Sequence, residues 1–131
     1  MIGDRMTPVR RFSPATIAAL DRAKILGVRV GTEHKYTAVW VVVVEGRVFV
    51  RSWNDKPTGW YRAFLAEARG QIHFADHVER LVCAVPVRSA RLRDAVSTAL
   101  AAKYDTKASK KWVDGFALAE RVAHTLDLTP R

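Results

Sequence analysis

The sequence lacks several features that would place it outside the cytoplasm. Its 131 residues include a single cysteine, Cys83, so an internal disulfide is impossible and a reducing compartment is expected. The longest apolar run, residues 38–44, is far too short to span a bilayer. The first twelve residues contain no apolar stretch of signal-peptide length. These absences predict a cytoplasmic protein with no membrane partner.

Motifs that name a reaction are missing as well. The chain has no Gly-x-Gly-x-x-Gly fingerprint, no phosphate-binding loop, no His-Glu-x-x-His pair and no Gly-x-Ser-x-Gly elbow. Its four histidines, at positions 34, 73, 77 and 124, have no acidic or cysteine partner at zinc-ligand spacing. We therefore predict neither a metal site nor a hydrolytic triad.

Composition indicates a folded, basic domain. Hydrophobic residues make up 49% and charged residues 27% of the chain, which is typical of a single globular domain over residues 1–131. Residues 1–12 are expected to form a flexible basic arm. Lysine and arginine number 22 against 13 acidic residues, a formal charge of +9. Such a charge attracts anions, including nucleotides, phosphorylated cofactors and nucleic acid, although a basic surface without a specific partner is the alternative.

Periodicity and capping residues predict the elements of secondary structure. Ser13 and Ser89 can cap helices, and Gly27 and Gly70 are expected to end helices. Residues 38–44 are β-branched and apolar on both faces, as in a buried central strand, and Glu45-Gly46 supplies a hairpin turn. The expected helices are 13–27, 60–69, 89–104 and 114–121. The expected strands are 28–32, 38–44, 47–53, 71–75, 78–87 and 125–128, with a turn at 76–77.

About six strands joined by tight turns exceed what one flat sheet needs, so a small antiparallel barrel with helices packed outside is predicted. The strand 47–53 should alternate, with Val48 and Val50 on one face and Phe49 and Arg51 on the other. The fold class is therefore α+β.

At several segments the chain resembles the uncharacterised bacterial proteins grouped as domain of unknown function 2255. The matching segments are Val39–Val42, Val48–Ser52, Trp60–Arg62 and Ala102–Tyr104, with a weaker match at Thr125–Arg131. Together they span about residues 38 to 131. The Arg51-Ser52 and Trp60-Tyr61-Arg62 pair is the most specific part.

That family is in turn similar to the split β-barrel flavoproteins, which include pyridoxamine-phosphate-oxidase-like proteins and deazaflavin-dependent nitroreductases. The resemblance implies a small antiparallel split β-barrel with flanking helices and a homodimer. It further implies that flavin mononucleotide (FMN) or a deazaflavin lies at the dimer interface, and that the protein is an oxidoreductase. The cofactor's phosphate would lie near the corner between a strand and the following helix.

Three residues near that corner suit an anion. A guanidinium such as that of Arg51 can hold a phosphate through two parallel hydrogen bonds, and Ser52 can donate its hydroxyl. Arg62 lies in the first turn of its helix, where exposed N–H groups favour an anion. The alternatives are a salt bridge from Arg51 to Glu67 or Asp55, and a solvated Arg62.

Aromatic residues near the same corner could bind a flat ring. Trp53, Trp60 and Tyr61 could stack on an isoalloxazine, although aromatic residues at such positions are often part of the core. Lys35 and Tyr36 precede the central strand, and the fold resemblance implies that they reach the opening of the barrel at the same corner.

The segment 103–112 mixes cations with aromatic residues, which is typical of contact with a nucleic-acid backbone; a solvated basic loop is the alternative. Three functions therefore remain open. The first is a flavin- or deazaflavin-binding redox protein. The second is a non-catalytic barrel that binds another anionic or aromatic small molecule. The third is a small nucleic-acid-binding barrel.

Overall fold

The computed structural model describes residues 10–75 and 77–131, and it contains both helices and strands. Its described helices are α2 (Pro14–Arg22), α3 (Trp60–Ala66), α4 (Ala90–Lys103), α5 (Lys110–Phe116) and α6 (Ala119–Val122). Its described strands are β1 (Leu26–Arg29), β2 (Thr37–Val39), β3 (Val42–Val44), β4 (Arg47–Arg51), β5 (Arg69–His73), β6 (Arg80–Pro86) and β7 (Thr125–Pro130).

The strands form one antiparallel sheet whose edges are joined by a very short link. The strand order is β2-β1-β5-β6-β7-β4-β3, so the two edge strands are consecutive in the chain. Only Trp40 and Val41 separate them, and this link reaches at most about 11 Å, since each Cα–Cα step is about 3.8 Å. A flat seven-stranded sheet would be about 29 Å wide at about 4.8 Å per strand. The sheet must therefore curl until its edges approach each other.

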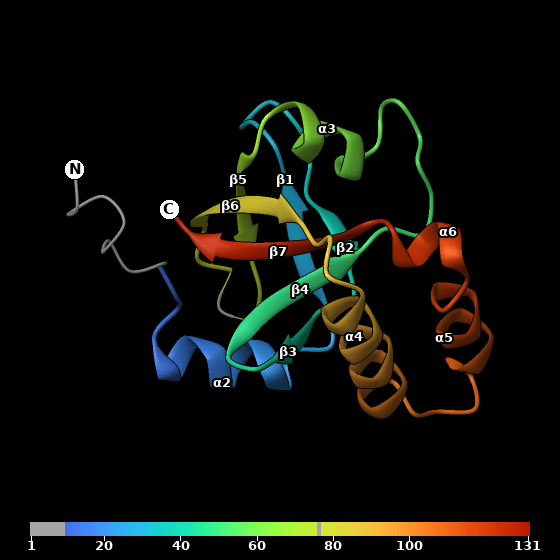
Figure 1. Ribbon diagram of the computed structural model, residues 1–131. Helices are drawn as coiled ribbons and strands as arrows, with labels where there is room; N and C mark the ends of the chain where they lie inside the picture. Colours follow the sequence, from blue (N-terminus) through green and yellow to red (C-terminus); the bar gives the residue numbers. More distant parts are fainter. Residues whose placement is uncertain (1–9, 76) are drawn as a thin grey trace, which may run out of the picture.

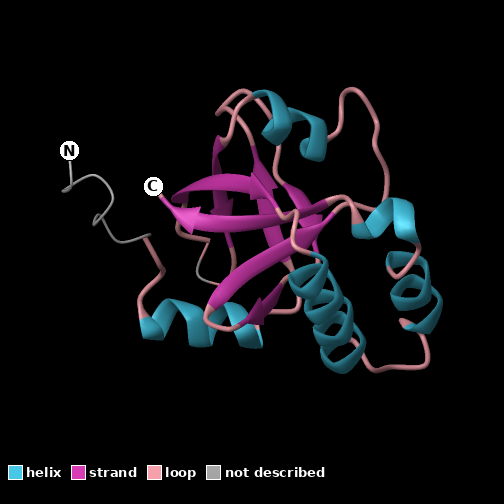
Figure 2. Ribbon diagram, viewed as in Figure 1, coloured by secondary structure: helices cyan, strands magenta, loops and turns pink. Residues whose placement is uncertain are grey.

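The curled sheet confirms the predicted fold class. The seven strands make an antiparallel half-barrel, and the helices lie around it (Figures 1 and 2). In Figure 1, α3 lies above the barrel and α2 below it, while α4 and α5 run side by side along one flank. None of the described helices is long and apolar enough to cross a membrane.

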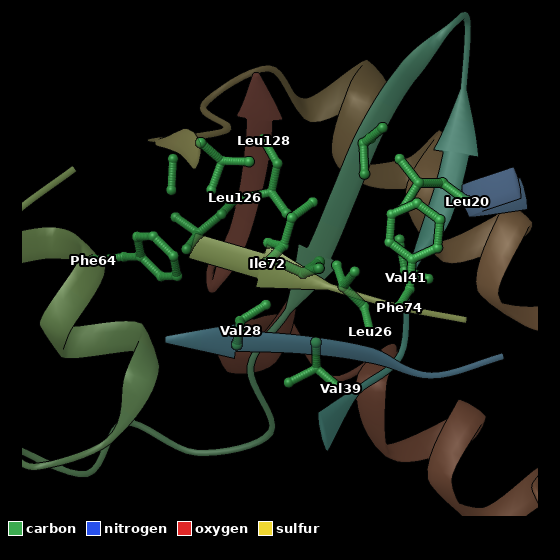
Figure 3. Close-up of a cluster of buried hydrophobic side chains, with 14 of the residues drawn as sticks. Leu20, Leu26, Val28, Val39, Val41, Phe64, Ile72, Phe74, Leu126 and Leu128 are labelled. Carbon is green, nitrogen blue, oxygen red and sulfur yellow. The ribbon is translucent and has the colours of Figure 1, made fainter. Parts of the chain in front are cut away.

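Aliphatic side chains fill the barrel interior. Leu26, Val28, Ile72, Leu126 and Leu128 come from three different strands and are almost completely buried. Figure 3 shows these side chains directed toward one another. The labelled side chains of α2 and α3, Leu20 and Phe64, lie at opposite ends of this cluster in the same view.

A second apolar cluster lies outside the barrel wall, under α4. Phe49 of β4 is fully buried there with Val96 and Leu100 of α4. Val48 and Val50, the neighbours of Phe49, belong instead to the interior cluster. The predicted alternation along this strand is therefore confirmed, and both of its faces are covered.

Local signals set the helix starts and the hairpin turn as predicted. The hydroxyls of Ser13 and Ser89 accept hydrogen bonds from backbone N–H groups three residues later, at 3.2 Å in each case. Glu45 and Gly46 have φ angles of 54° and 72°, the left-handed pair that a tight hairpin turn requires. Glycine favours this turn because it adopts positive φ without steric cost.

Side chains at the C-terminal end of α4 bind the backbone of Val41 in the two-residue link. The Tyr104 hydroxyl accepts a hydrogen bond from the Val41 N–H at 3.1 Å and donates to the Lys24 carbonyl at 2.7 Å. Lys103 Nζ donates to the carbonyls of Val41 at 2.7 Å and Leu20 at 3.2 Å. Burial lowers the pKa of Lys103 to about 8. This pair thus supplies hydrogen-bond partners for both backbone groups of Val41, which no neighbouring strand provides.

The structure corrects the predicted central strand. Residues 38–44 were expected to form one continuous strand, but the strand is broken at Trp40 and Val41. The residues before the break pair with β1, and those after it pair with β4 on the opposite edge of the sheet. Residues 1–9, most of the predicted basic arm, and Asp76 of the predicted turn lie outside the described residues.

Two glycines predicted to end helices lie inside strands instead. Gly27 belongs to β1 and Gly70 to β5. A Cβ on Gly70 would lie 2.6 Å from the Arg29 carbonyl oxygen and 2.6 Å from the Phe64 ring. Glycine is needed there because strand and helix approach too closely for any side chain. The predicted helix 114–121 is also two short helices, α5 and α6.

We predict that Tyr104→Phe lowers the free energy of unfolding by about 1–3 kcal/mol. The substitution keeps the ring but removes the partner of the buried Val41 N–H and Lys24 carbonyl. Chemical denaturation measures the change. Tyr61→Phe is the control, because the Tyr61 ring is buried while its hydroxyl bonds to none of the described residues. Equal stability of the two variants would contradict the role given to Tyr104.

Candidate ligand-binding cleft

The break at Trp40 opens a cleft in the barrel wall. The pairing of β3 with β4 sets Val42 opposite Phe49, and its continuation would set Trp40 opposite Arg51. The chain instead diverges there, since β2 pairs with β1 while β4 pairs with β7. The space between β2 and residues 51–54 is a cleft of about 310 Å³, called here the split cleft. It is lined by Ile25, Ala38, Val39, Trp40, Arg51, Ser52, Trp53, Asn54, Trp60, Trp112 and Phe116.

All four tryptophans of the chain line the split cleft. Trp40 lies in the link between β2 and β3, and Trp53 lies just after β4. Trp60 begins α3, and Trp112 lies in α5. Four separate segments therefore contribute to one aromatic wall.

The orientation of Trp40 is set by the same tyrosine that stabilises the link. Its ring stacks on Tyr104 with centroids 4.0 Å apart and an interplanar angle of 4°. Phe116 lies 5.6 Å away at a tilt. Because the hydroxyl of Tyr104 is bound to the backbone of Val41 in the link and of Lys24 before β1, the stacked pair is pre-organised.

Trp53 is held by the α5–α6 segment. The Arg121 guanidinium lies 3.6 Å from the centre of the indole, and its Nε donates to the Trp53 carbonyl at 2.8 Å. Phe116 meets the ring edge-on at 5.2 Å. Gly115 faces the ring so closely that a Cβ there would lie 2.1 Å from it. These contacts fix α5, and with it Trp112, against the cleft.

Arg51 is buried at the base of the cleft and is bound to neutral groups. Its Nε donates to the Thr125 hydroxyl at 2.8 Å, and its Nη1 donates to the Ser97 hydroxyl at 2.8 Å and the Phe116 carbonyl at 3.0 Å. Its Nη2 donates to the Arg93 carbonyl at 2.9 Å. A guanidinium has five N–H donors, so one donor on Nη2 is left over.

No carboxylate of the described residues forms an ion pair with Arg51. The salt bridges considered from the sequence are therefore wrong: Glu67 pairs with Arg69, and Asp55 pairs with Arg62. Local pairing at the surface is the reason, because each carboxylate has an arginine close in sequence.

The electrostatics of Arg51 favour an anion in the cleft. The side chain is only 3% exposed, and burial lowers its pKa to about 10, with a smaller contribution from the nearby Arg93 charge. The charge of Asp94 acts in the opposite direction but less strongly. A buried cation without a counter-ion is costly, so a negative group in the adjoining cleft would stabilise it.

The three residues predicted to hold a phosphate do not come together. Ser52 lines the split cleft with Arg51, but its hydroxyl donates to the Asn54 carbonyl at 2.5 Å. Arg62 lies outside the cleft, exposed, in a two-pronged ion pair with Asp55. This pairing lowers the pKa of Asp55 and raises that of Arg62.

Of the residues predicted to line a ring, Trp53 and Trp60 do line the split cleft. Tyr61 is buried beside His124, with the ring centroids 4.7 Å apart. Tyr36 faces elsewhere: its hydroxyl donates to Glu79 at 2.7 Å, and burial with this bond raises its pKa to about 12.

Lys35, the last predicted residue, does not line the split cleft but a second, smaller cleft, and Trp60 belongs to both.

Sequence reasoning missed three aromatic residues of the cleft, Trp40, Trp112 and Phe116. Trp40 was assigned to a continuous buried strand, and Trp112 to a basic segment for which nucleic-acid contact and a solvated loop were both left open. Their aromatic character was visible in the sequence, but nothing local brought Trp112 to the barrel. That placement depends on the non-local contact of α5 with Trp53.

The basic segment 103–112 does not present all of its cations and aromatic residues on one surface, although Lys111 Nζ lies 5.2 Å from the centre of the Trp112 ring. Lys103 and Tyr104 turn inward to the link, and Trp112 lines the split cleft. Lys110 pairs with Asp114 at 3.1 Å. Nucleic-acid binding stays a prediction, but these contacts give the sequence pattern another explanation.

Ionisable groups are scarce in the cleft. Among the described residues that line it, Arg51 is the sole ionisable side chain. Within residues 10–75 and 77–131, no three histidine, cysteine or acidic side chains are grouped so that they could hold a metal ion. The described lining residues therefore offer aromatic surface and the single charge of Arg51.

Comparisons with known proteins agree with the fold. The family described as "Uncharacterized protein conserved in bacteria (DUF2255)" matches residues 15–128. The chain belongs to this family. The match confirms the predicted family and extends it toward the N-terminus. No curated protein matches the sequence.

Among solved structures, that of a protein of similar fold matches this DUF2255 protein over most of its length. It is the crystal structure of conserved hypothetical protein Rv2991 from Mycobacterium tuberculosis, with a TM-score of 0.53 and 16% identity. The match covers 93% of this chain and 83% of that chain. At this identity the likeness concerns the fold alone, and the predicted link to flavin-binding barrels stays a prediction.

We expect Arg51→Met to lower the free energy of unfolding by about 2–4 kcal/mol. Four hydrogen bonds are lost, each worth about 0.5–1.5 kcal/mol net, and relief from burying a charge offsets part of the loss. Arg62→Met is the matched control, and its exposed ion pair predicts little change. Urea denaturation of both variants measures the two changes in unfolding free energy. Similar midpoints would show that Arg51 contributes no more to stability than the exposed Arg62 does.

Proposed function

We propose that this protein binds a flat aromatic ligand that carries negative charge, and that the split cleft is its binding site. The observation that supports this most strongly is the meeting of all four tryptophans with an arginine that lacks a carboxylate partner among the described residues. Aromatic walls favour a planar ring, and the Arg51 charge favours an anion.

The size of the cleft suits a ring system. At about 310 Å³ it lies at the lower end of the range for small-molecule sites, which is about 300–1,000 Å³. A ring with its immediate substituents fits this volume better than a whole dinucleotide does. The Trp40–Tyr104 stack and the contacts around Trp53 hold the walls in place before a ligand arrives, which reduces the entropic cost of binding.

Flavins and deazaflavins are the first ligands to test. Their ring systems match the aromatic walls, and such a cofactor, once bound, would supply hydride or electron transfer. Their phosphate does not match the predicted trio, because Arg62 lies outside the cleft and Ser52 is engaged with Asn54. Arg51 would contribute charge stabilisation near the ring. The homodimer implied by the family resemblance stays a prediction.

A binding protein without catalysis is the second candidate. It is favoured by one feature of the split cleft, the lack of an acid or base among the described residues that line it. A redox protein that depends on its cofactor needs no such group, so the ligand itself separates the two candidates. A bound ligand that cannot be reduced or oxidised would exclude the redox function and favour the non-catalytic one.

We expect FMN or a deazaflavin to quench most of the tryptophan fluorescence as it binds. Every indole of the chain lies in the cleft wall, so a bound ring would take up excitation from all of them. The same ligand should raise the melting temperature, since it binds the folded state alone. Neither quenching nor a higher melting temperature with either ligand would reject them as ligands of this cleft.

Trp112→Ala should weaken that binding roughly fivefold to a hundredfold, because stacking on an aromatic side chain is worth about 1–3 kcal/mol. Trp112 is 42% exposed, so its loss should leave the fold intact. Leu118→Ala is the matched control: Leu118 is 52% exposed, lies just beyond α5 and does not line the cleft. Equal affinities of the two variants would contradict the assigned site.

A further inference from the structure

A second cleft adjoins the split cleft at Trp60. It has a volume of about 140 Å³ and is called here the polar cleft. Trp60 lines both clefts, and the adjacent residues Thr37 and Ala38 of β2 each line one of them. The polar cleft is lined by Val28, Arg29, Val30, His34, Lys35, Thr37, Thr58, Gly59, Trp60 and Ala63.

The polar cleft is rich in hydrogen-bond donors. Arg29, His34 and Lys35 contribute nitrogen groups, and Thr37 and Thr58 contribute hydroxyls. None of its described lining residues is acidic. Its small volume cannot take a fused ring system but can take a phosphate-sized group. Size and chemistry therefore differ from those of the split cleft, which is larger and mainly aromatic.

Several of these donors have no partner within the described parts of the chain. Lys35, Thr37 and Thr58 are solvent-exposed, and their side chains make no hydrogen bond or ion pair with residues 10–75 or 77–131, so they are available to a ligand. Arg29 donates to Glu79 at 2.6 Å, which neutralises part of its charge, yet its buried Nε has no acceptor. Lys35 thus provides the uncompensated charge of this cleft.

We propose that the polar cleft binds a phosphate group of the same ligand whose ring lies in the split cleft. This inference rests on the function proposed above and adds a phosphate monoester to the ligand's chemistry. The ammonium of Lys35 and the hydroxyls of Thr37 and Thr58 donate to the phosphate oxygens. Trp60 stands between the two clefts, so the chain that joins ring and phosphate passes along its indole.

The test compares FMN with riboflavin, which has the same ring and no phosphate. Dissociation constants come from tryptophan quenching in the wild type, Lys35→Met and Lys56→Met. We expect wild-type protein to bind FMN roughly ten- to a hundredfold more tightly than riboflavin, because hydrogen bonds to charged groups contribute about 1.5–3 kcal/mol. Lys35→Met should bring this ratio close to one without changing riboflavin affinity.

Lys56→Met controls for general surface charge. Lys56 is an exposed lysine of the loop before α3 and does not line the polar cleft. This variant should keep the wild-type preference for FMN. Inorganic phosphate separates the ligand's own phosphate from a free one: it should compete with FMN in the wild type but leave riboflavin binding unchanged.

Each outcome of this test has one meaning. If FMN and riboflavin bind equally well, if Lys35→Met keeps the preference for FMN, or if both lysine variants lose it alike, the phosphate site is wrong while the ring site stands. If neither ligand quenches the tryptophans, flavins are rejected for the split cleft, and the phosphate assignment is rejected with them.

Discussion

A two-residue link between the two edges of the sheet is the constraint on which the structure depends. Because only Trp40 and Val41 connect β2 to β3, the sheet must curl, and its two edges approach each other at one seam. The backbone at this seam has no neighbouring strand, so its polar groups need other partners. Lys103 and Tyr104 supply them from the end of α4. The end of a helix therefore supplies the backbone hydrogen bonds that a neighbouring strand would supply in a flat sheet.

The same constraint produces the candidate site. A chain that changes sheet edge at Trp40 must part from the end of β4, and the cleft is the gap that this leaves. Aromatic side chains from α3 and α5 cover the gap, and Arg51 lies at its base with neutral partners only. Burying the Arg51 charge without a counter-ion costs free energy, and an anionic ligand would lower that cost. This is how the fold favours the proposed function. The polar cleft beyond Trp60 extends the same reasoning to a phosphate.

Local interactions made much of the fold predictable. The alternation that sends Phe49 outward and its neighbours inward depends on strand geometry alone, as do the serine caps and the turn at Gly46. The break at Trp40 was not predictable, because it depends on which distant strands accept each half of the run. Arg51 lies next to Trp53 as its place in the sequence requires, but its hydrogen-bond partners come from distant segments. Trp112 was missed because only the packing of α5 brings it to the barrel.

Nuclear magnetic resonance of the indole N–H groups tests the central claim most directly. The four tryptophans give four signals, and each reports on a different segment of the cleft wall. During titration with FMN, the account predicts that all four signals change and saturate at a single ligand concentration, because one ligand contacts one wall. Backbone signals that shift elsewhere while the four indoles stay unchanged would contradict it, and so would indoles that respond with different affinities.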